Sequence, residues 1–209
     1  MIRFLLLSLL MLPVTASELV VRDVRLGLST LPSAFDFTLK NSTTDTSGSD
    51  SFDGGLALDG GMRWSFARPG DSFGLIAGAD LAIQGQSYDG GDGLTAVVGK
   101  LAGGLGWAAT DTVTVTGELL AGYGLSSLSL PATTAAPSFS ADGTVFDYEL
   151  RFTATWLFER RFGVGLSTGW MIASHTLSGD DTDVTVDQSG WYVGLMAVWR
   201  INDEPPALQ

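Results

Sequence analysis

Hydrophobic and polar residues alternate along much of this chain. In residues 145–158, aromatic and aliphatic side chains fall on one parity, and charged or Thr side chains fall on the other. A period of two is that of a β-strand with one apolar face, and aromatic and Thr residues favour strands. The run exceeds the length of about five or six residues that is usual for soluble strands. The length of this strand is therefore informative in itself.

Seven further segments alternate in the same way, and none has a convincing helical period. This pattern predicts an all-β protein with eight strands. We expect them near residues 20–31, 55–66, 73–86, 94–107, 113–128, 145–158, 162–177 and 191–201.

The connectors between these segments alternate between short and long. Residues 67–72, 108–112 and 159–161 suit tight antiparallel hairpins. The long connectors are rich in Ser, Thr, Asp and Gly, and comprise residues 32–53, 87–93, 129–143 and 178–190. Short and long connectors would therefore lie at opposite ends of an antiparallel meander.

Residues 1–16 have the features of a secretory signal peptide, with one cation, an apolar run and a small-residue exit. The apolar run is too short for a membrane helix, which needs about 20 residues. Aromatic residues also gather near strand ends, at Trp64, Phe66, Phe73, Trp107, Trp156, Phe158, Phe162, Trp191 and Trp199.

Strand length, signal peptide, end aromatics and connector asymmetry together favour a transmembrane β-barrel over a soluble sandwich. Sixteen strands of about ten residues each would not fit the chain. The sequence therefore predicts an eight-stranded antiparallel up-and-down transmembrane β-barrel. We expect this barrel to occupy residues 17–201 and a short periplasmic tail to occupy residues 202–209. An even strand count would place both termini on the periplasmic side of a bacterial outer membrane.

If the apolar parity faces lipid, the other parity must fill a narrow interior. Six acids and five bases fall on that parity, and such a mixture can form a paired network that avoids isolated buried charges. We interpret the network as a salt-bridged plug, and a rearranging ion path is the alternative. The residues are Asp23, Arg25, Asp59, Arg63, Asp80, Lys100, Glu118, Asp147, Glu149, Arg151 and Arg200.

The chain has a net charge of −12 and no cysteine. The acidic balance excludes nucleic-acid binding, and the missing cysteines exclude disulfides and thiolate chemistry. Most of the excess acid falls in the predicted loops, where solvated, mobile segments or an extracellular ligand site are expected. We predict no cofactor and no metal site, because no calcium-loop pattern is present. The acids are Asp36, Asp45, Asp50, Asp53, Asp89, Asp92, Asp142, Asp180, Asp181, Asp183 and Asp187.

His175 is the single histidine, on the interior parity near the outer end of the seventh predicted strand, with Ser174 and Ser178 beside it. A Ser-His-acid hydrolase would need such groups together in space. Barrels that deacylate lipid A carry a His-x-Ser pair, and position 177 is Leu here. We therefore predict no enzyme, and a lipid-modifying hydrolase remains the minor alternative.

The architecture, the interior charges and the last strand resemble the small eight-stranded outer-membrane barrels of the OmpA/OmpX type. The segment 192–199, with Tyr192, Gly194 and the aromatic Trp199, is similar to the C-terminal signal that the barrel-assembly machinery recognises in such proteins. The resemblance implies outer-membrane lipid and this machinery as partners. It also implies a structural or surface-interaction role, with a narrow channel for ions or small solutes as the alternative.

Overall fold

The computed structural model describes residues 19–41, 43, 45–67, 72–88, 93–130, 138–158, 161–179 and 181–201. The predicted signal peptide and periplasmic tail lie outside these residues. Among those described, no helix is long and apolar enough to cross a membrane. The ten strands are β1 (Leu19–Thr30), β2 (Ala34–Asn41), β3 (Asp45–Ser51), β4 (Gly54–Ala67), β5 (Phe73–Ser87), β6 (Gly93–Ala108), β7 (Val113–Leu130), β8 (Phe139–Phe158), β9 (Phe162–Gly179) and β10 (Thr182–Arg200).

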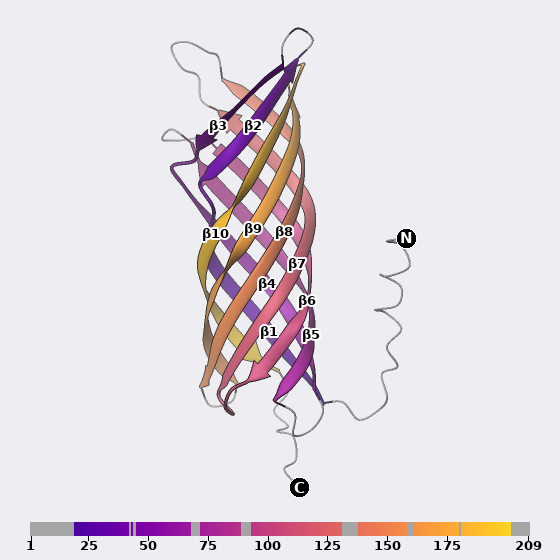
Figure 1. The fold of residues 1–209 in the computed structure, drawn as a ribbon, viewed down its shortest axis with the longest axis vertical. Helices are drawn as coiled ribbons and strands as arrows, with labels where there is room; N and C mark the ends of the chain where they lie inside the picture. Colours follow the sequence, from indigo (N-terminus) through magenta and orange to yellow (C-terminus); the bar gives the residue numbers. More distant parts are fainter. Residues whose placement is uncertain are drawn as a thin grey trace, which may run out of the picture.

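Eight of the strands close into a ring. They follow the order β1-β4-β5-β6-β7-β8-β9-β10, each pair is antiparallel, and β1 pairs with β10 to close the circle (Figure 1). Closure matters because lipid offers no hydrogen bonds to an unpaired strand edge. The predicted eight-stranded antiparallel barrel is confirmed.

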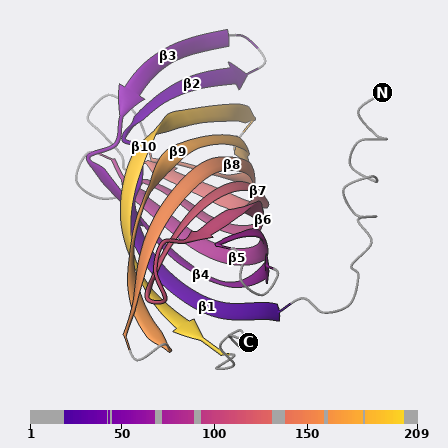
Figure 2. The ribbon, with the colours of Figure 1, turned by 60° about the horizontal axis from the view of Figure 1, so that its bottom comes forward.

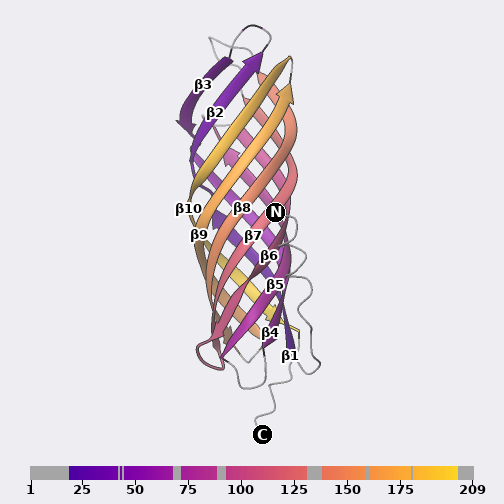
Figure 3. The same ribbon diagram turned by 45° about the vertical axis from the view of Figure 1, so that its right-hand side comes forward.

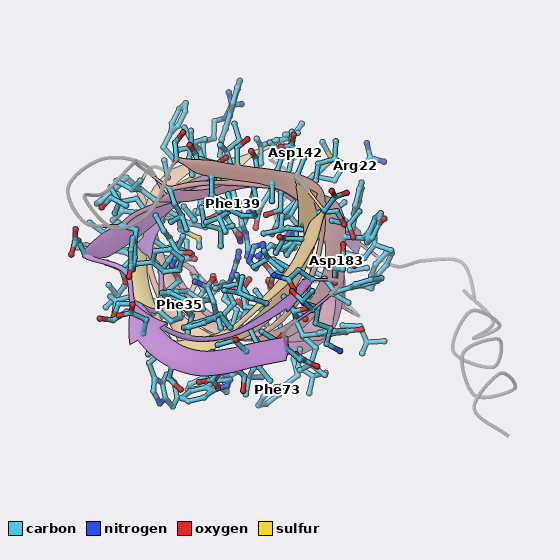
Figure 4. All side chains as sticks on the ribbon, turned by 90° about the horizontal axis from the view of Figure 1, so that it is seen from above. Arg22, Phe35, Phe73, Phe139, Asp142 and Asp183 are labelled. Atoms are coloured by element: carbon cyan, nitrogen blue, oxygen red, sulfur yellow. The ribbon has the colours of Figure 1, made fainter. Side chains whose placement is uncertain are left out.

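The outer surface of the ring is apolar. Along β9, the outward side chains Phe162, Val164, Leu166 and Ile172 are each about half exposed, whereas the inward positions are buried. Figure 4 shows the same division, with Phe73 outside the ring and Phe139 inside it. A belt of this kind is stable where lipid covers it.

Aromatic pairs lie at both ends of the apolar belt. Phe73 stacks on Trp107 and Phe162 on Trp199 at the end that carries Leu19 and Ile201. At the other end, Trp170 meets Trp191 edge to face, and Tyr123 contacts Phe146. Amphipathic rings favour the membrane interface, so these pairs mark its two levels.

Two of the predicted long connectors are wrong. Residues 32–53 contain a hairpin of β2 and β3, and residues 178–190 are mostly the end of β9 and the start of β10. The third, 129–143, is also shorter than expected, because β8 begins at Phe139. In β2 and in the first part of β10 the period of two continues, but the outward side chains are polar. Because no apolar outer face is present, the sequence of these strands resembles that of loops.

The acidic residues of these segments are therefore mainly strand residues. Asp89, Asp92 and Asp180 lie outside the described residues, and Asp53 and Asp181 lie at a bend and a turn. The remaining members occupy regular strands, which contradicts the expectation of mobile acidic loops: Asp36, Asp45, Asp50, Asp142, Asp183 and Asp187.

The hairpin changes the ring at one end. Below the hairpin β10 pairs with β1, but from Gln188 to Thr182 it pairs with β2 instead. β3 pairs with β2 and ends the sheet (Figure 2). The upper sheet therefore rises beyond the membrane belt on one side of the barrel, as Figure 3 also shows.

A charged side chain introduced within the apolar belt should destabilise the protein more than one introduced above it. Leu119 is 67% exposed in the middle of the apolar face of β7, whereas Leu39, 36% exposed, lies on the hairpin above it. We expect Leu119→Lys to lower the free energy of unfolding by about 2–4 kcal/mol, measured by urea titration in lipid bilayers. Leu39→Lys is the control and should have little effect. Equal losses for both variants would contradict the membrane level assigned to the belt.

Candidate functional site: the buried charge network

The interior of the barrel is layered along its axis. The inward positions of β8 show the order, since this strand crosses the whole barrel. Ala141 and Val145 belong to apolar clusters, the next three inward residues are charged, and Leu157 belongs to a third apolar cluster. The charged layer thus lies between two apolar ones.

Arg63 is at the centre of the charged layer. It is fully buried, and its guanidinium forms two parallel bonds to Asp80, of 2.5 and 2.7 Å. The same group donates to Glu118 at 3.0 Å, and Arg25 donates to the second oxygen of Glu118 at 2.9 Å. Bidentate arginine–carboxylate geometry is among the strongest pairings available to side chains.

Arg151 joins this half of the network to the other. It donates to Glu149 at 2.6 and 3.1 Å, and reaches Asp80 at 3.3 Å and Asp59 at 3.5 Å. Lys100 then contacts Glu149 at 3.1 Å and Asp147 at 2.8 Å. These contacts link four bases and five carboxylates in one continuous network.

Two polar side chains complete the network. The Tyr192 hydroxyl donates a short hydrogen bond to Glu149 and accepts one from Arg151 at 3.2 Å. Gln84 donates to Asp147 at 2.8 Å. Each of them binds a carboxylate oxygen that already has a charged partner, so the network has neutral members as well as ions.

All eleven predicted interior charges point into the barrel, but they do not form one group. Nine belong to the network described above. Asp23 and Arg200 form a separate pair at 3.1 Å, near the end of the barrel that carries Leu19 and Ile201. This pair is less shielded than the network, because the Arg200 side chain is about one-fifth exposed.

Glycines make room for the long side chains. A Cβ at Gly61 would overlap the carboxylate of Asp80, and one at Gly78 would overlap the side chain of Arg63. The two glycines lie on neighbouring strands, directly opposite the charged residues whose space they provide. Their lack of a side chain is what lets the Arg63–Asp80 pair fit within the wall.

Little space remains inside. A cavity of about 10 Å³ lies among Asp59, Lys100, Glu149, Arg151 and Tyr192. A single water molecule needs roughly 10–15 Å³ by this kind of measure. The side chains of the charged layer therefore leave room for about one water molecule at this point.

The assembly-signal pattern does not indicate where the Tyr192 side chain lies. We assigned it with Gly194 and Trp199 to the assembly signal, yet its side chain is buried in the network, whereas Trp199 faces outward and is 54% exposed. The period of two would have placed Tyr192 inside, on the parity opposite to Trp199. Recognition by the assembly machinery stays a prediction for all three residues.

His175 lies on the interior side of β9 and is buried. Its Nδ1 is 2.8 Å from the Ser126 hydroxyl of β7. Ser174 and Ser178 face outward instead, where they donate to Asp187 and Asp183. Ser174 and Ser178 therefore do not meet His175 as a Ser-His-acid hydrolase would need, because side chains at odd and even positions of a strand point to opposite faces.

The described residues contain no group of three or more His, Cys, Asp or Glu side chains suited to a metal ion. The carboxylates of the network are instead used by arginine and lysine. The described side chains of the network are therefore engaged in charge pairing and hydrogen bonding.

No model of a protein family and no curated protein matches the sequence. Solved structures of small outer-membrane barrels do match. Ail, the attachment invasion locus protein of Yersinia pestis, is 16% identical, with 86% of this chain and 98% of that one covered and a TM-score of 0.38. OprG of Pseudomonas aeruginosa is 12% identical, with 89% and 98% covered and a TM-score of 0.49.

Neisserial surface protein A is 8% identical, with 84% of this chain and 95% of that one covered and a TM-score of 0.44. The resemblance noted in the sequence thus extends to solved barrels of this type. This likeness is one of fold alone. The eight-strand ring and its apolar belt carry the assignment of the fold.

Removing one partner of the network should cost more than removing an exposed charge. Glu118→Ala would leave Arg25 and Arg63 without their shared carboxylate, and such losses cost about 3–5 kcal/mol. Glu118→Gln should cost less, because the amide oxygen still accepts a hydrogen bond. Urea unfolding in bilayers measures both, with exposed Asp111→Asn as the control. A Glu118→Ala value within about 0.5 kcal/mol of wild type, the range of ordinary surface changes, would contradict the pairing.

Proposed function

We propose that this protein is a closed outer-membrane barrel that holds a polar sheet above the membrane surface, in a structural or surface-interaction role. The observation that carries the proposal is the continuous charge network with its cavity of about 10 Å³. A sealed barrel does not let solutes cross the membrane but holds the protein in it. Its exposed sheet is therefore the part available to other molecules.

We place the termini in the periplasm and the β2–β3 hairpin outside the cell. The support is the asymmetry of the two ends: the first and last described residues, Leu19 and Ile201, lie at the end with short connectors, and the extended strands rise from the other (Figure 1). Barrels of the bacterial outer membrane have short periplasmic turns and longer external segments. Outer-membrane lipid and the assembly machinery are the expected partners.

The proposal includes the absence of catalysis. His175 and Ser126 meet at 2.8 Å, but both are buried in the barrel, with exposed fractions of 1% and 5%. The apolar cluster that contains Leu94, Leu128 and Leu177 lies above them. A lipid substrate would have to displace this cluster, which argues against a hydrolase.

Conductance tests the sealed state. We expect wild-type protein in planar lipid bilayers to show no steady opening, because Arg63 and Arg151 fill the interior and are held by carboxylates. The double variant Arg63→Ala, Arg151→Ala removes both guanidinium groups and should leak. Its folding is checked by the gel-mobility shift on heating, which unfolded barrels lack.

The channel alternative makes the opposite prediction. A steady wild-type conductance that disappears in Arg151→Ala or Glu118→Ala would show that the charges line a working path. That result would overturn the proposed sealed barrel.

A further inference from the structure

β3 has one unpaired edge. It pairs with β2 along one side, and no described strand pairs with the other side. In membrane barrels closure leaves no such edge within lipid, and here the edge lies above the apolar belt. Its seven residues include no Lys and no Pro, which often block edges against pairing.

The backbone groups at this edge can be assigned. The Phe52 N–H donates to the Ser33 carbonyl at 2.8 Å. Because hydrogen-bonded positions alternate along an antiparallel pair, Gly48 and Asp50 bond to β2. The N–H and C=O groups of Ser47 and Ser49 therefore point away from β2, toward the free edge.

The inner face of the edge is aromatic. The ring of Phe37 lies over Gly48, with its Cζ atom 2.8 Å from the position that a Cβ would take. Because Gly48 has no side chain, this ring is within reach of an apolar group on an added strand. Below it, Phe35, Phe52 and Tyr88 pack together, as Figure 4 shows for the inward-pointing Phe35.

The outer face of the same sheet is acidic. Asp36 of β2 lies directly opposite Asp187 of β10, an unfavourable arrangement of like charges. Two rows higher on the same face, Lys40 lies between Asp183 and Asp45. The outward residues of β10, β2 and β3 at this level thus contribute four carboxylates and one base.

Tyr88 binds a further carboxylate beside the edge, that of Asp50. Its hydroxyl donates to Asp50 at 2.6 Å, and this bond lowers the pKa of the Asp50 carboxyl. The carboxylate is therefore charged at neutral pH. A second copy of the chain is a poor occupant, because pairing two β3 edges would bring two acidic faces together.

We propose that the free edge of β3 binds an extended cationic peptide segment, which adds as a further antiparallel or parallel strand. Backbone groups of Ser47 and Ser49 bind the peptide main chain. An inward apolar side chain contacts the Phe37 ring across Gly48, and outward basic side chains lie near Asp45 and Asp36. The recognised pattern is alternation of basic and apolar residues, and this inference deepens the proposed surface-interaction role.

A labelled heptapeptide of alternating lysine and valine is the probe. We expect its fluorescence anisotropy to rise saturably with full-length protein in non-ionic detergent micelles, and the affinity to fall with added salt. An isomer with all lysines before the valines, and a glutamate–valine peptide, should each bind at least about tenfold more weakly, as expected if one to three net hydrogen bonds or charge contacts are lost.

Two changes isolate the backbone pairing. Ser47→Pro with Ser49→Pro removes the free-edge donors and keeps the bonds to β2, since proline is tolerated at such edge positions. N-methylation of alternate peptide residues removes the same bonds without altering the protein. Each should weaken binding at least about tenfold, whereas Asp111→Asn at the opposite end should not.

The inference would be overturned if the alternating peptide, the isomer with all lysines before the valines and the N-methylated peptide bound equally well. Binding would then depend on charge alone. No binding of the alternating peptide would overturn it as well. Neither result bears on the sealed barrel, which conductance tests separately. The heat-dependent gel shift shows whether the proline variant is folded, and the N-methylated peptides keep the test decisive if it is not.

Discussion

The requirement that every strand edge in lipid has a hydrogen-bonding partner determines most of this structure. An unpaired backbone group in the hydrocarbon region costs several kcal/mol, so the strands at membrane depth form a closed ring. Closure of eight strands gives an interior only wide enough for side chains. The inward parity must then be a packed core, even though it carries charges that a soluble core would exclude.

Charge pairing makes this core possible. Arg63 contacts two carboxylates and Arg151 contacts three, so that neither guanidinium depends on a single partner. Glycines opposite these side chains supply the volume. Apolar clusters above and below separate the charged layer from water. The core of the barrel is therefore partly apolar and partly charged.

The period of two was sufficient to predict the ring, its lipid-facing residues and the inward direction of the charges, because a strand leaves each residue only two possible faces. It did not reveal which inward charges meet. Partners such as Arg25 and Glu118 are 93 residues apart, and their contact depends on the stagger between strands. Tyr192 was misjudged for another reason, since a motif resemblance drew attention away from its parity.

Above the apolar belt, the sequence pattern did not reveal the strands as strands. Within lipid an outward side chain must be apolar, whereas in water it can be polar, so the apolar outer face that marks a membrane strand is lost there. A strand in water can carry Thr, Ser and Asp outward, and its unpaired edge is not prohibitive. The Asp36–Lys40 part of β2 alternates as regularly as the membrane strands, but without a long apolar face it resembles a loop. β3, with Gly and Ser at its centre, has no apolar face at all. Contact with water instead of lipid makes these strands hard to recognise in the sequence. It also allows β3 to keep an unpaired edge, because water can bind the free backbone groups. The barrel wall cannot bind a further strand, and this hairpin can.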